Sequence, residues 1–411
     1  MMNNKIKVIG NGNVCSPKGF TSGSIFSGIK SPGQDKKDIG IIFSEKPCIS
    51  AGTFTQNSIV SPSVSWTRNV LNSGNIQAIV ANSGCANTAV GIQGLKDAEE
   101  MANITCKKLN ININSVAVAS TGIIGVELPM ALMRKYIPKI ELSSNGGNGF
   151  ANSILTTDKR TKEIAFSIKI HNKEVKVGGV AKGSGMIHPN MATMLSFITT
   201  DVDIDKIALQ KIIKSAVKKS FNQISVDGDQ STNDTVLIIA NGLANNNKLK
   251  DLSSEETKLF SNTVQKVCTF LAKEIARDGE GNNRLIETEI VGAKTTKDAL
   301  LASRYVVSSN LVKTAVYGRD PNWGRIIGAV GASQIDLNES KIDIFVNDIQ
   351  IVAEGVAISY NHQSIVIAMG EEVIRFKINL NIGDKSAKAW GSELTEELED
   401  EIEWQDEDTE C

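Results

Sequence analysis

The stretch KGSGMIHPNMATMLSF, residues 182–197, changes character in its middle and decides the fold. Its first half is rich in glycine and polar residues, which suits an irregular loop. From Thr193 onward the residues TMLSFITT are largely apolar or β-branched, which predicts a buried strand over 193–200. The chain therefore passes from a loop into a strand between Ala192 and Thr193.

Strand and helix patterns alternate on both sides of this stretch, which predicts a layered α/β (α+β) fold. Strands are predicted over residues 76–84, 115–120, 234–241, 341–355 and 372–383, the last two as strands of a hairpin. Apolar residues recur at helical spacing over residues 92–110, 206–220, 255–279 and about 297–308. We expect the segment from about residue 295 to 411 to form a smaller C-terminal α+β subdomain.

The composition argues against several classes of protein. Of the 411 residues, 41% are hydrophobic, which is enough for a large core, and only 5% are aromatic. Residues 392–411 hold eleven acidic residues and no Lys or Arg, so the rest of the chain is mildly positive. The chain has neither a basic stripe with interleaved aromatic residues nor an apolar run near the roughly 20 residues of a membrane span. We expect a cytoplasmic protein with no nucleic-acid or membrane partner.

Few residue types remain for metal or cofactor chemistry. The only histidines are His171, His188 and His362, which leaves little room for a Ser-His-Asp triad or a multi-histidine metal site. The six cysteines are scattered without a C-x-x-C pair, and the glycine-rich segments miss the phosphate-binding patterns. We therefore expect neither a metal nor a cofactor.

An N-terminal threonine would supply a nucleophile without any histidine. Cleavage of the Ala192–Thr193 bond would free an α-amine with a pKa of about 8, which can deprotonate the hydroxyl of the same residue. Attack of the Thr193 hydroxyl on the Ala192 carbonyl could make that cut in a strained, firmly held loop. Taken alone, the local pattern favours an ordinary strand residue at position 193.

Two other segments could contribute to such a site. ASTGIIGVELP, residues 119–129, follows a strand and opens toward a helix, so the Thr121 hydroxyl and the Gly122 N–H could bind an anion. The alternative is a simple helix-entry turn. RDGEGNNR, residues 277–284, places Glu280 between two glycines, where its carboxylate could face an amine or could simply be a solvated turn acid.

Together these segments resemble the ornithine acetyltransferases, the bifunctional glutamate N-acetyltransferases of arginine biosynthesis (ArgJ family). The motifs that carry the resemblance follow one another along nearly the whole chain: SPKGFTSGSIFSGIK (16–30), NSGCANTAVGIQGLKDAEEM (82–101), STGIIGVELP, TTDKRTKE, KGSGMIHPNMATMLSF, DGDQSTNDT, RDGEGNN, GRDPNWGRI and AWGSELTEE (389–397). The resemblance implies a self-cleaving, N-terminal-nucleophile-like fold. It also implies an α chain, residues 1–192, and a β chain, residues 193–411.

The same resemblance implies a reaction and roles for named residues. Thr193 would carry an acetyl group from N2-acetyl-L-ornithine to L-glutamate in a ping-pong cycle, and Thr121 and Gly122 would form the oxyanion hole. Substrate contacts are implied for Thr156, Lys182, Thr193 and Glu280. An assembly of two α and two β chains is also implied, and acetyl-CoA is left open as a second acetyl donor.

The C-terminus departs from the family pattern. Family chains end soon after the WG..LT element, with an Asn and a terminal Thr that line the substrate site. In this chain no Asn follows position 390, and the tail ends in Cys411. Acidic residues entering the pocket would repel a glutamate carboxylate. Two alternatives stay open: an amidase or aminopeptidase of the related self-cleaving fold with water as acceptor, and a degenerate, non-catalytic relative.

Overall fold

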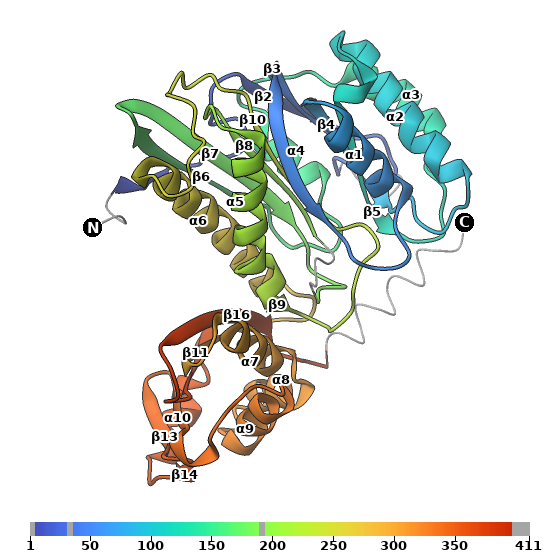
Figure 1. Ribbon diagram of the computed structural model, residues 1–411. Coiled ribbons are helices and arrows are strands. Elements are labelled where there is room, and N and C mark those ends of the chain that lie inside the picture. The colour runs from blue at the N-terminus through green and yellow to red at the C-terminus, as the bar shows by residue number, and fades with distance from the viewer. Residues whose placement is uncertain (1–4, 31–35, 189–193, 397–411) are drawn as a thin grey trace. The chain divides into compact units, whose positions relative to one another are not determined.

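The computed structural model describes residues 5–30, 36–188 and 194–396. The predicted cleavage site, Ala192 and Thr193, lies outside these residues, as does the tail from 397 onward. The chain forms two compact units, which Figure 1 shows in ribbon form. Unit 1 consists of Met1–Gly183, Asn190–Lys218 and Gln230–Leu271, and unit 2 of Ser184–Pro189, Lys219–Asp229 and Ala272–Cys411.

Unit 1 is built on a nine-stranded mixed sheet. The strand order is β1-β6-β7-β8-β10-β3-β4-β5, and β2 pairs with β3. The strands are β1 Lys7–Ile9, β2 Phe20–Ile25, β3 Ile39–Phe54, β4 Ile76–Cys85, β5 Val116–Ile123, β6 Lys162–Ile170, β7 Lys173–Lys182, β8 Leu195–Thr200 and β10 Thr235–Ala240. The strands predicted over 76–84 and 234–241 are confirmed, and the described part of the strand predicted over 193–200 is β8.

Strands β8 and β10 lie in the middle of this sheet. Every residue of both strands is buried, as expected for apolar and β-branched runs covered on both faces. The two strands are parallel, in a register that pairs Leu195 with Thr235. On its other side β8 pairs antiparallel with β7, and β10 pairs antiparallel with β3.

Helices flank the sheet of unit 1. They are α1 Pro62–Ser73, α2 Gln93–Leu109, α3 Met130–Tyr136, α4 Gly147–Ser153, α5 Lys206–Lys218 and α6 Glu255–Arg277, the last of which belongs to unit 1 as far as Leu271. Helix α1 packs against β5, and α5 packs against β3. In α2 the buried residues Ala98, Met101 and Ala102 follow helical spacing, and Asn110 ends the helix in a left-handed conformation with φ of 54°. The helices predicted over 92–110, 206–220 and 255–279 are confirmed.

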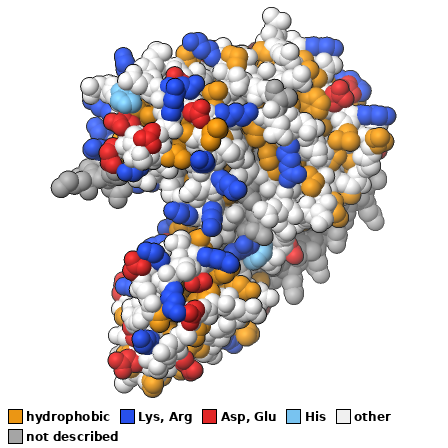
Figure 2. Space-filling model, viewed as in Figure 1, with side chains coloured by type: hydrophobic (Ala, Val, Ile, Leu, Met, Phe, Trp, Pro, Cys, Tyr) orange, Lys and Arg blue, Asp and Glu red, His pale blue; other side chains and the backbone are white. Residues whose placement is uncertain are grey.

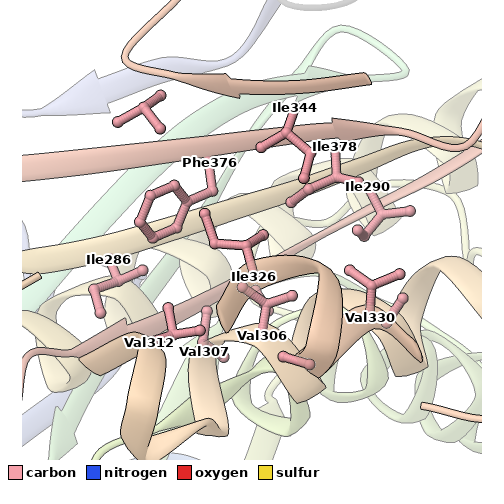
Figure 3. Packing of buried hydrophobic residues seen from close by; sticks show 14 of the residues in the cluster. Ile286, Ile290, Val306, Val307, Val312, Ile326, Val330, Ile344, Phe376 and Ile378 are labelled. Carbon is pink, nitrogen blue, oxygen red and sulfur yellow. The ribbon is translucent and has the colours of Figure 1, made fainter. Parts of the chain in front are cut away.

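Unit 2 has a seven-stranded sheet in the order β14-β13-β12-β15-β11-β16-β9. Its strands are β9 Ile224–Ser225, β11 Leu285–Ala293, β12 Asp343–Val346, β13 Ile349–Ala353, β14 Val356–Ala357, β15 Val373–Asn379 and β16 Lys385–Ser392. Its helices are α7 Thr296–Ser308, α8 Asn310–Tyr317, α9 Trp323–Ala332 and α10 His362–Ala368. Figure 3 shows how Ile286, Phe376 and Ile378 from the sheet pack with Val306 and Ile326 from the helices.

The segment predicted as one strand over 341–355 instead holds two strands, β12 and β13. They form a hairpin whose turn residues, Asn347 and Asp348, both have positive φ angles, of 42° and 69°. Two successive left-handed residues make the tight turn that matches the twist of paired strands. Strand β12 also pairs antiparallel with β15 of the second predicted segment, but β13, β14 and α10 lie between them in the chain, so the two segments do not form the predicted hairpin.

The surface and the helices add two observations. On the face shown in Figure 2, basic and acidic side chains are interspersed with apolar ones over each unit. Within the described residues, none of the helices is both long enough and apolar enough to cross a membrane.

Candidate active site

Lys182, the last residue of β7, is buried in unit 1 with 3% of its surface exposed. Its Nζ donates hydrogen bonds to Thr156 Oγ1 at 2.9 Å and to Thr121 Oγ1 at 3.2 Å. The three residues come from β7, the turn after α4 and strand β5. Three of the site residues predicted from the sequence are therefore brought together.

Asp158 accepts hydrogen bonds from one residue of this cluster and from two others near it in the chain. Its Oδ1 accepts hydrogen bonds from Gly183 N at 2.7 Å and from Lys162 Nζ at 2.6 Å, and its Oδ2 accepts one from Thr156 N at 3.1 Å. Burial alone would raise the pKa of this carboxyl, but the charges of Lys182 and Lys162, with the Gly183 N–H, outweigh it and hold the pKa at about 2. The carboxylate stays ionised and fixes the backbone on both sides of the Lys182 ammonium.

Thr121 and Gly122 lie within strand β5, which continues to Ile123. Helix α3 begins only at Met130, so Thr121 and Gly122 lie neither in a helix-entry turn nor at a helix N-terminus, contrary to what the sequence suggests. The register of β4 and β5 pairs Gly122 with Gly84. Gly122 has φ of 129°, and a Cβ at this position would lie 2.3 Å from the carbonyl carbon of Gly84. Only glycine fits, because the conformation and the space both exclude a side chain.

Asn233 ties this end of β5 to the rest of unit 1. Its Nδ2 donates to the carbonyl oxygens of Ser120 at 2.9 Å and Ala86 at 2.5 Å, and its Oδ1 accepts from Thr88 Oγ1 at 2.8 Å. Ser120 directly precedes Thr121, so this fully used amide holds the peptide that leads into the predicted oxyanion pair.

Asp234 follows directly and contacts the start of β8. Its Oδ1 accepts a hydrogen bond from Met194 N at 2.8 Å, and Met194 is the residue bonded to Thr193. The next residue, Thr235, donates its own N–H to the carbonyl oxygen of Met194 at 3.1 Å. Both backbone polar groups of Met194 are therefore held by neighbouring residues of one segment.

Glu280 belongs to unit 2, in the turn that follows α6. It is half-buried, and its backbone N–H donates to Ser184 O at 3.4 Å. The carboxylate packs against Gly185, where an added Cβ would lie 2.3 Å from Glu280 Oε2. The Ser184 hydroxyl also donates to Asp278 O at 2.5 Å, so segment 184–185 fixes both ends of the Glu280 turn.

The last described residues of the chain also secure this turn. Thr395 Oγ1 donates to Gly281 O at 2.5 Å, and Glu393 accepts from Asn283 N at 3.1 Å and from Arg284 Nη1 at 2.6 Å. The Glu393 side chain is fully buried in this ion pair. The WGSELT element thus has a structural task in unit 2: it anchors the loop that carries Glu280.

The unit 1 cluster has the chemistry of an anion site. The Lys182 ammonium donates to two hydroxyls, and its charge acts strongly on nearby anions because little water screens it in the interior. The cluster lies at the carboxyl ends of the parallel strands β4 and β5, where open sheets commonly bind ligands. It is therefore suited to a substrate carboxylate or to a developing oxyanion.

Residues 21–399 of the chain match the ArgJ family. The chain belongs to the ArgJ family. Among its relatives, the arginine biosynthesis bifunctional protein ArgJ of Oceanobacillus iheyensis is 44% identical over 392 residues, which cover 95% of each chain. The protein of the same name from Dehalococcoides mccartyi is 41% identical, over 96% of this chain and 98% of its own.

A solved ArgJ structure is also similar. The crystal structure of the Bacillus halodurans arginine biosynthesis bifunctional protein has a TM-score of 0.50 and 39% identity, and the match covers 52% of this chain and all of that chain. ArgJ membership makes the protein an acyltransferase of arginine biosynthesis, as predicted, with the layered α/β fold expected from the sequence.

Three polar residues of this ArgJ chain were missed as candidates from the sequence: Asp158, Asn233 and Asp234. They lie inside the motifs TTDKRTKE and DGDQSTNDT, which pointed to the family but not to separate roles. Their contacts reach residues far away in the chain, such as the 113 positions between Asn233 and Ser120. A sequence-level signal exists only in the density of Asp and Asn next to buried strands.

Proposed function

We propose that the protein transfers the acetyl group of N2-acetyl-L-ornithine to L-glutamate through an ester on Thr193. The observation that carries this proposal is the buried Lys182 ammonium, which donates hydrogen bonds to Thr121 and Thr156. Lys182 ends the strand that precedes Thr193 in the chain. The relatives are named as bifunctional proteins of arginine biosynthesis, and the resemblance to the ornithine acetyltransferases suggests the two substrates.

In this proposal the chain first cuts itself. The Thr193 hydroxyl attacks the Ala192 carbonyl carbon, the C–N bond breaks, and the acyl group moves to the threonine oxygen as an ester. Water then hydrolyses the ester, leaving a carboxylate on Ala192, a free hydroxyl and a new α-amine on Thr193. The products are the α chain, residues 1–192, and the β chain, residues 193–411.

Acetyl transfer then follows in two half-reactions. The α-amine of Thr193 takes the hydroxyl proton while the oxygen attacks the acetyl carbonyl, and the Thr121 hydroxyl and the Gly122 N–H stabilise the oxyanion. Collapse expels the α-amine of ornithine, which takes the proton and leaves acetyl-Thr193. The amine of glutamate attacks this ester, giving N-acetylglutamate and the original hydroxyl, so the cycle needs no cofactor.

Charged residues would bind the two amino acids. Lys182 meets a substrate carboxylate beside Thr156, and Glu280 meets the side-chain ammonium of ornithine. Both contacts gain strength where water is excluded. The proposal includes an assembly of two α and two β chains in the cytoplasm.

The mass of the purified protein under denaturing conditions tests the self-cleavage. We expect two pieces that divide at Ala192–Thr193 in the wild type, and one uncut chain for Thr193→Ala, which lacks the attacking oxygen. Thr193→Ser is the matched control, because it keeps a hydroxyl and should be cut. A wild-type chain that stays whole, or a Thr193→Ala chain that is cut, contradicts the proposal.

Acceptor dependence tests the transfer reaction. With N-acetylornithine as donor, acetyl should appear on glutamate, and little acetate should form without glutamate. Rapid acetate release would favour the amidase alternative. Acetyl-CoA offered alone with glutamate decides whether it is a second donor. Glu280→Gln should raise KM for N-acetylornithine but leave cleavage intact, and an unchanged KM would refute its role.

A further inference from the structure

Two buried carboxyl groups mark the two ends of the central strand β8. Asp201 directly follows the strand, and Asp234 contacts Met194 directly before it. Both residues are buried in unit 1, with 0% and 1% of their surface exposed. They offer a comparison within one strand, because only one end is bonded to the predicted nucleophile.

At the far end, Asp201 uses both of its oxygens in the backbone. Oδ1 accepts from Lys176 N at 2.8 Å, and Oδ2 accepts from Lys18 N at 3.0 Å. Each oxygen therefore satisfies an N–H group that would otherwise lack an acceptor in the interior. These two hydrogen bonds give Asp201 a structural role, which is enough to explain why its carboxyl group is buried.

At the near end, Asp234 uses only one oxygen in this way. Oδ1 accepts from Met194 N at 2.8 Å, whereas Oδ2 accepts no backbone N–H in residues 5–30, 36–188 and 194–396 and has the Thr55 side chain and the charge of Lys182 near it. Burial raises the pKa of this carboxyl well above its ordinary value, and the Met194 N–H, the charge of Lys182 and the Thr55 side chain act in the opposite direction.

Support for the Met194 N–H alone does not account for an acid at this position. A neutral amide or hydroxyl would accept the same hydrogen bond without burying an ionisable group. Residues whose local chemistry is unfavourable for stability gather at functional sites. The N–H that Asp234 holds belongs to the peptide bond between Thr193 and Met194.

We propose that Asp234 is a positioning residue for the Thr193 nucleophile, acting through the Met194 N–H. The inference rests on the proposed function, in which Thr193 carries the acetyl group. Asp234 Oδ1 and the Thr235 N–H hold the two polar groups of the Met194 backbone, at 2.8 Å and 3.1 Å. A nucleophile attached to a fixed residue keeps its attack geometry, and misplacement by about 1 Å can lower a rate by roughly 100-fold.

The test compares Asp234→Ala and Asp234→Asn with Asp201→Ala as the matched control. For each protein the cleaved fraction, the melting temperature, and kcat and KM for N-acetylornithine are measured on the full chain. We expect Asp234→Ala to lower kcat by about 30- to 100-fold with KM within about two-fold of wild type. Asp234→Asn keeps a side-chain oxygen that can accept from the Met194 N–H, so its kcat should stay within about three-fold of wild type.

Asp201→Ala separates positioning from stability. It should lower the melting temperature at least as much as Asp234→Ala, because it removes the acceptor of two backbone N–H groups rather than one, yet keep the wild-type kcat. Equal kcat values for Asp234→Ala and Asp201→Ala at equal folded fractions would overturn the inference. Where Asp234→Ala fails to fold, Asp234→Asn decides: a folded but inactive protein refutes the acceptor role.

Failure of the proposed function would look different. A wild-type protein that is neither cut nor acetylated on Thr193 would overturn both proposals. An active wild type beside an equally active Asp234→Ala would overturn the positioning role alone. Mass spectrometry of the β chain after brief exposure to N-acetylornithine reads the acetyl group on Thr193 directly.

Discussion

Lys182 in unit 1 and Lys313 in unit 2 are both buried lysines, 3% and 1% exposed, yet their partners differ in kind. The partners of Lys182 include two threonine hydroxyls, and its charge also acts on the Asp158 carboxylate. Lys313, on α8, donates to the carbonyl oxygens of Val226 and Ser392, both at 2.7 Å, with Ser225 O at 3.3 Å and Ser392 Oγ at 3.2 Å as further acceptors. Carbonyls at strand ends are fixed, whereas hydroxyls can rotate toward a ligand.

The contrast shows that burial alone does not mark a functional cation. Desolvation lowers the pKa of Lys313 to about 7, which by itself would suggest a reactive amine. Its acceptors, however, are the Ser225 and Val226 carbonyls at the end of β9 and the Ser392 carbonyl and hydroxyl at the end of β16, all inside the protein. The chemistry of the partners separates a ligand-binding lysine from a structural one, and four changes test that distinction.

The largest effect is expected at Lys182. Lys182→Met removes the cation that meets the substrate carboxylate, so kcat/KM for acetyl transfer should fall by about 100- to 1000-fold. Steady-state kinetics with N-acetylornithine and glutamate measure this fall in kcat/KM. Lys313→Met is the control, because it makes the same substitution at the other buried lysine. A Lys182→Met protein with more than a tenth of wild-type activity would remove the proposed distinction.

Lys313→Met should act on stability instead. Three carbonyls and one hydroxyl would each lose one donor in the interior of unit 2, so the free energy of unfolding should fall by about 3 kcal/mol. Denaturant unfolding measures this change, and kcat at a temperature where the variant is folded should match wild type. A stable Lys313→Met protein with altered KM would reverse the roles assigned to the two lysines.

Acid should weaken the surroundings of Lys182 through Asp158. The pKa of this carboxyl in the fold, about 2, is below its ordinary value of 3.8, so its stabilisation is fully present above about pH 4 and is lost as pH falls toward 2. Its contribution is about 2 kcal/mol by that difference. The stability gap between wild type and Asp158→Asn should therefore shrink as pH falls from 5 to 2. A gap that is constant with pH would show that the carboxylate charge is not what Lys182 and Lys162 stabilise.

The smallest effect is expected for a partly exposed ion cluster of unit 2. Glu287 accepts from Lys273 at 2.8 Å, Lys388 at 3.0 Å and Trp390 Nε1 at 2.9 Å. Because solvent reaches both lysines, Glu287→Gln should lower the free energy of unfolding by only about 1 kcal/mol, less at high salt. A loss as large as that of Lys313→Met would mean that exposure does not weaken these contacts.

Elements with clear periodicity could be predicted from the sequence. Helices α2 and α6 repeat apolar residues at helical spacing, and β10 is a continuous apolar run, so local residues determine them. The extension of β5 through Gly122 could not be seen, because it depends on pairing with Gly84 on a strand 38 positions earlier. From the local sequence alone, a glycine at this position fits a turn as well as it fits a continuing strand.

In the candidate site, too, some residues could be predicted from the sequence and others could not. Thr121, Thr156 and Lys182 could be named because the chain resembles a family with known motifs, and the structure brings them together in unit 1. Asp158 and Asp234 could not, because their roles come from backbone N–H groups supplied by Gly183 and Met194. Which N–H lacks an acceptor is a property of the folded chain rather than of a local pattern.

The strand order of unit 1 has a consequence for any break between residues 192 and 193. Strands β8 and β10 would belong to the downstream piece, and they are flanked by β7 and β3 of the upstream piece on both sides. Neither piece could leave without opening two strand pairs in the middle of one sheet. The pieces would resist exchange between molecules, would co-purify through a tag on either one, and would need joint refolding rather than mixing to make hybrids of two relatives.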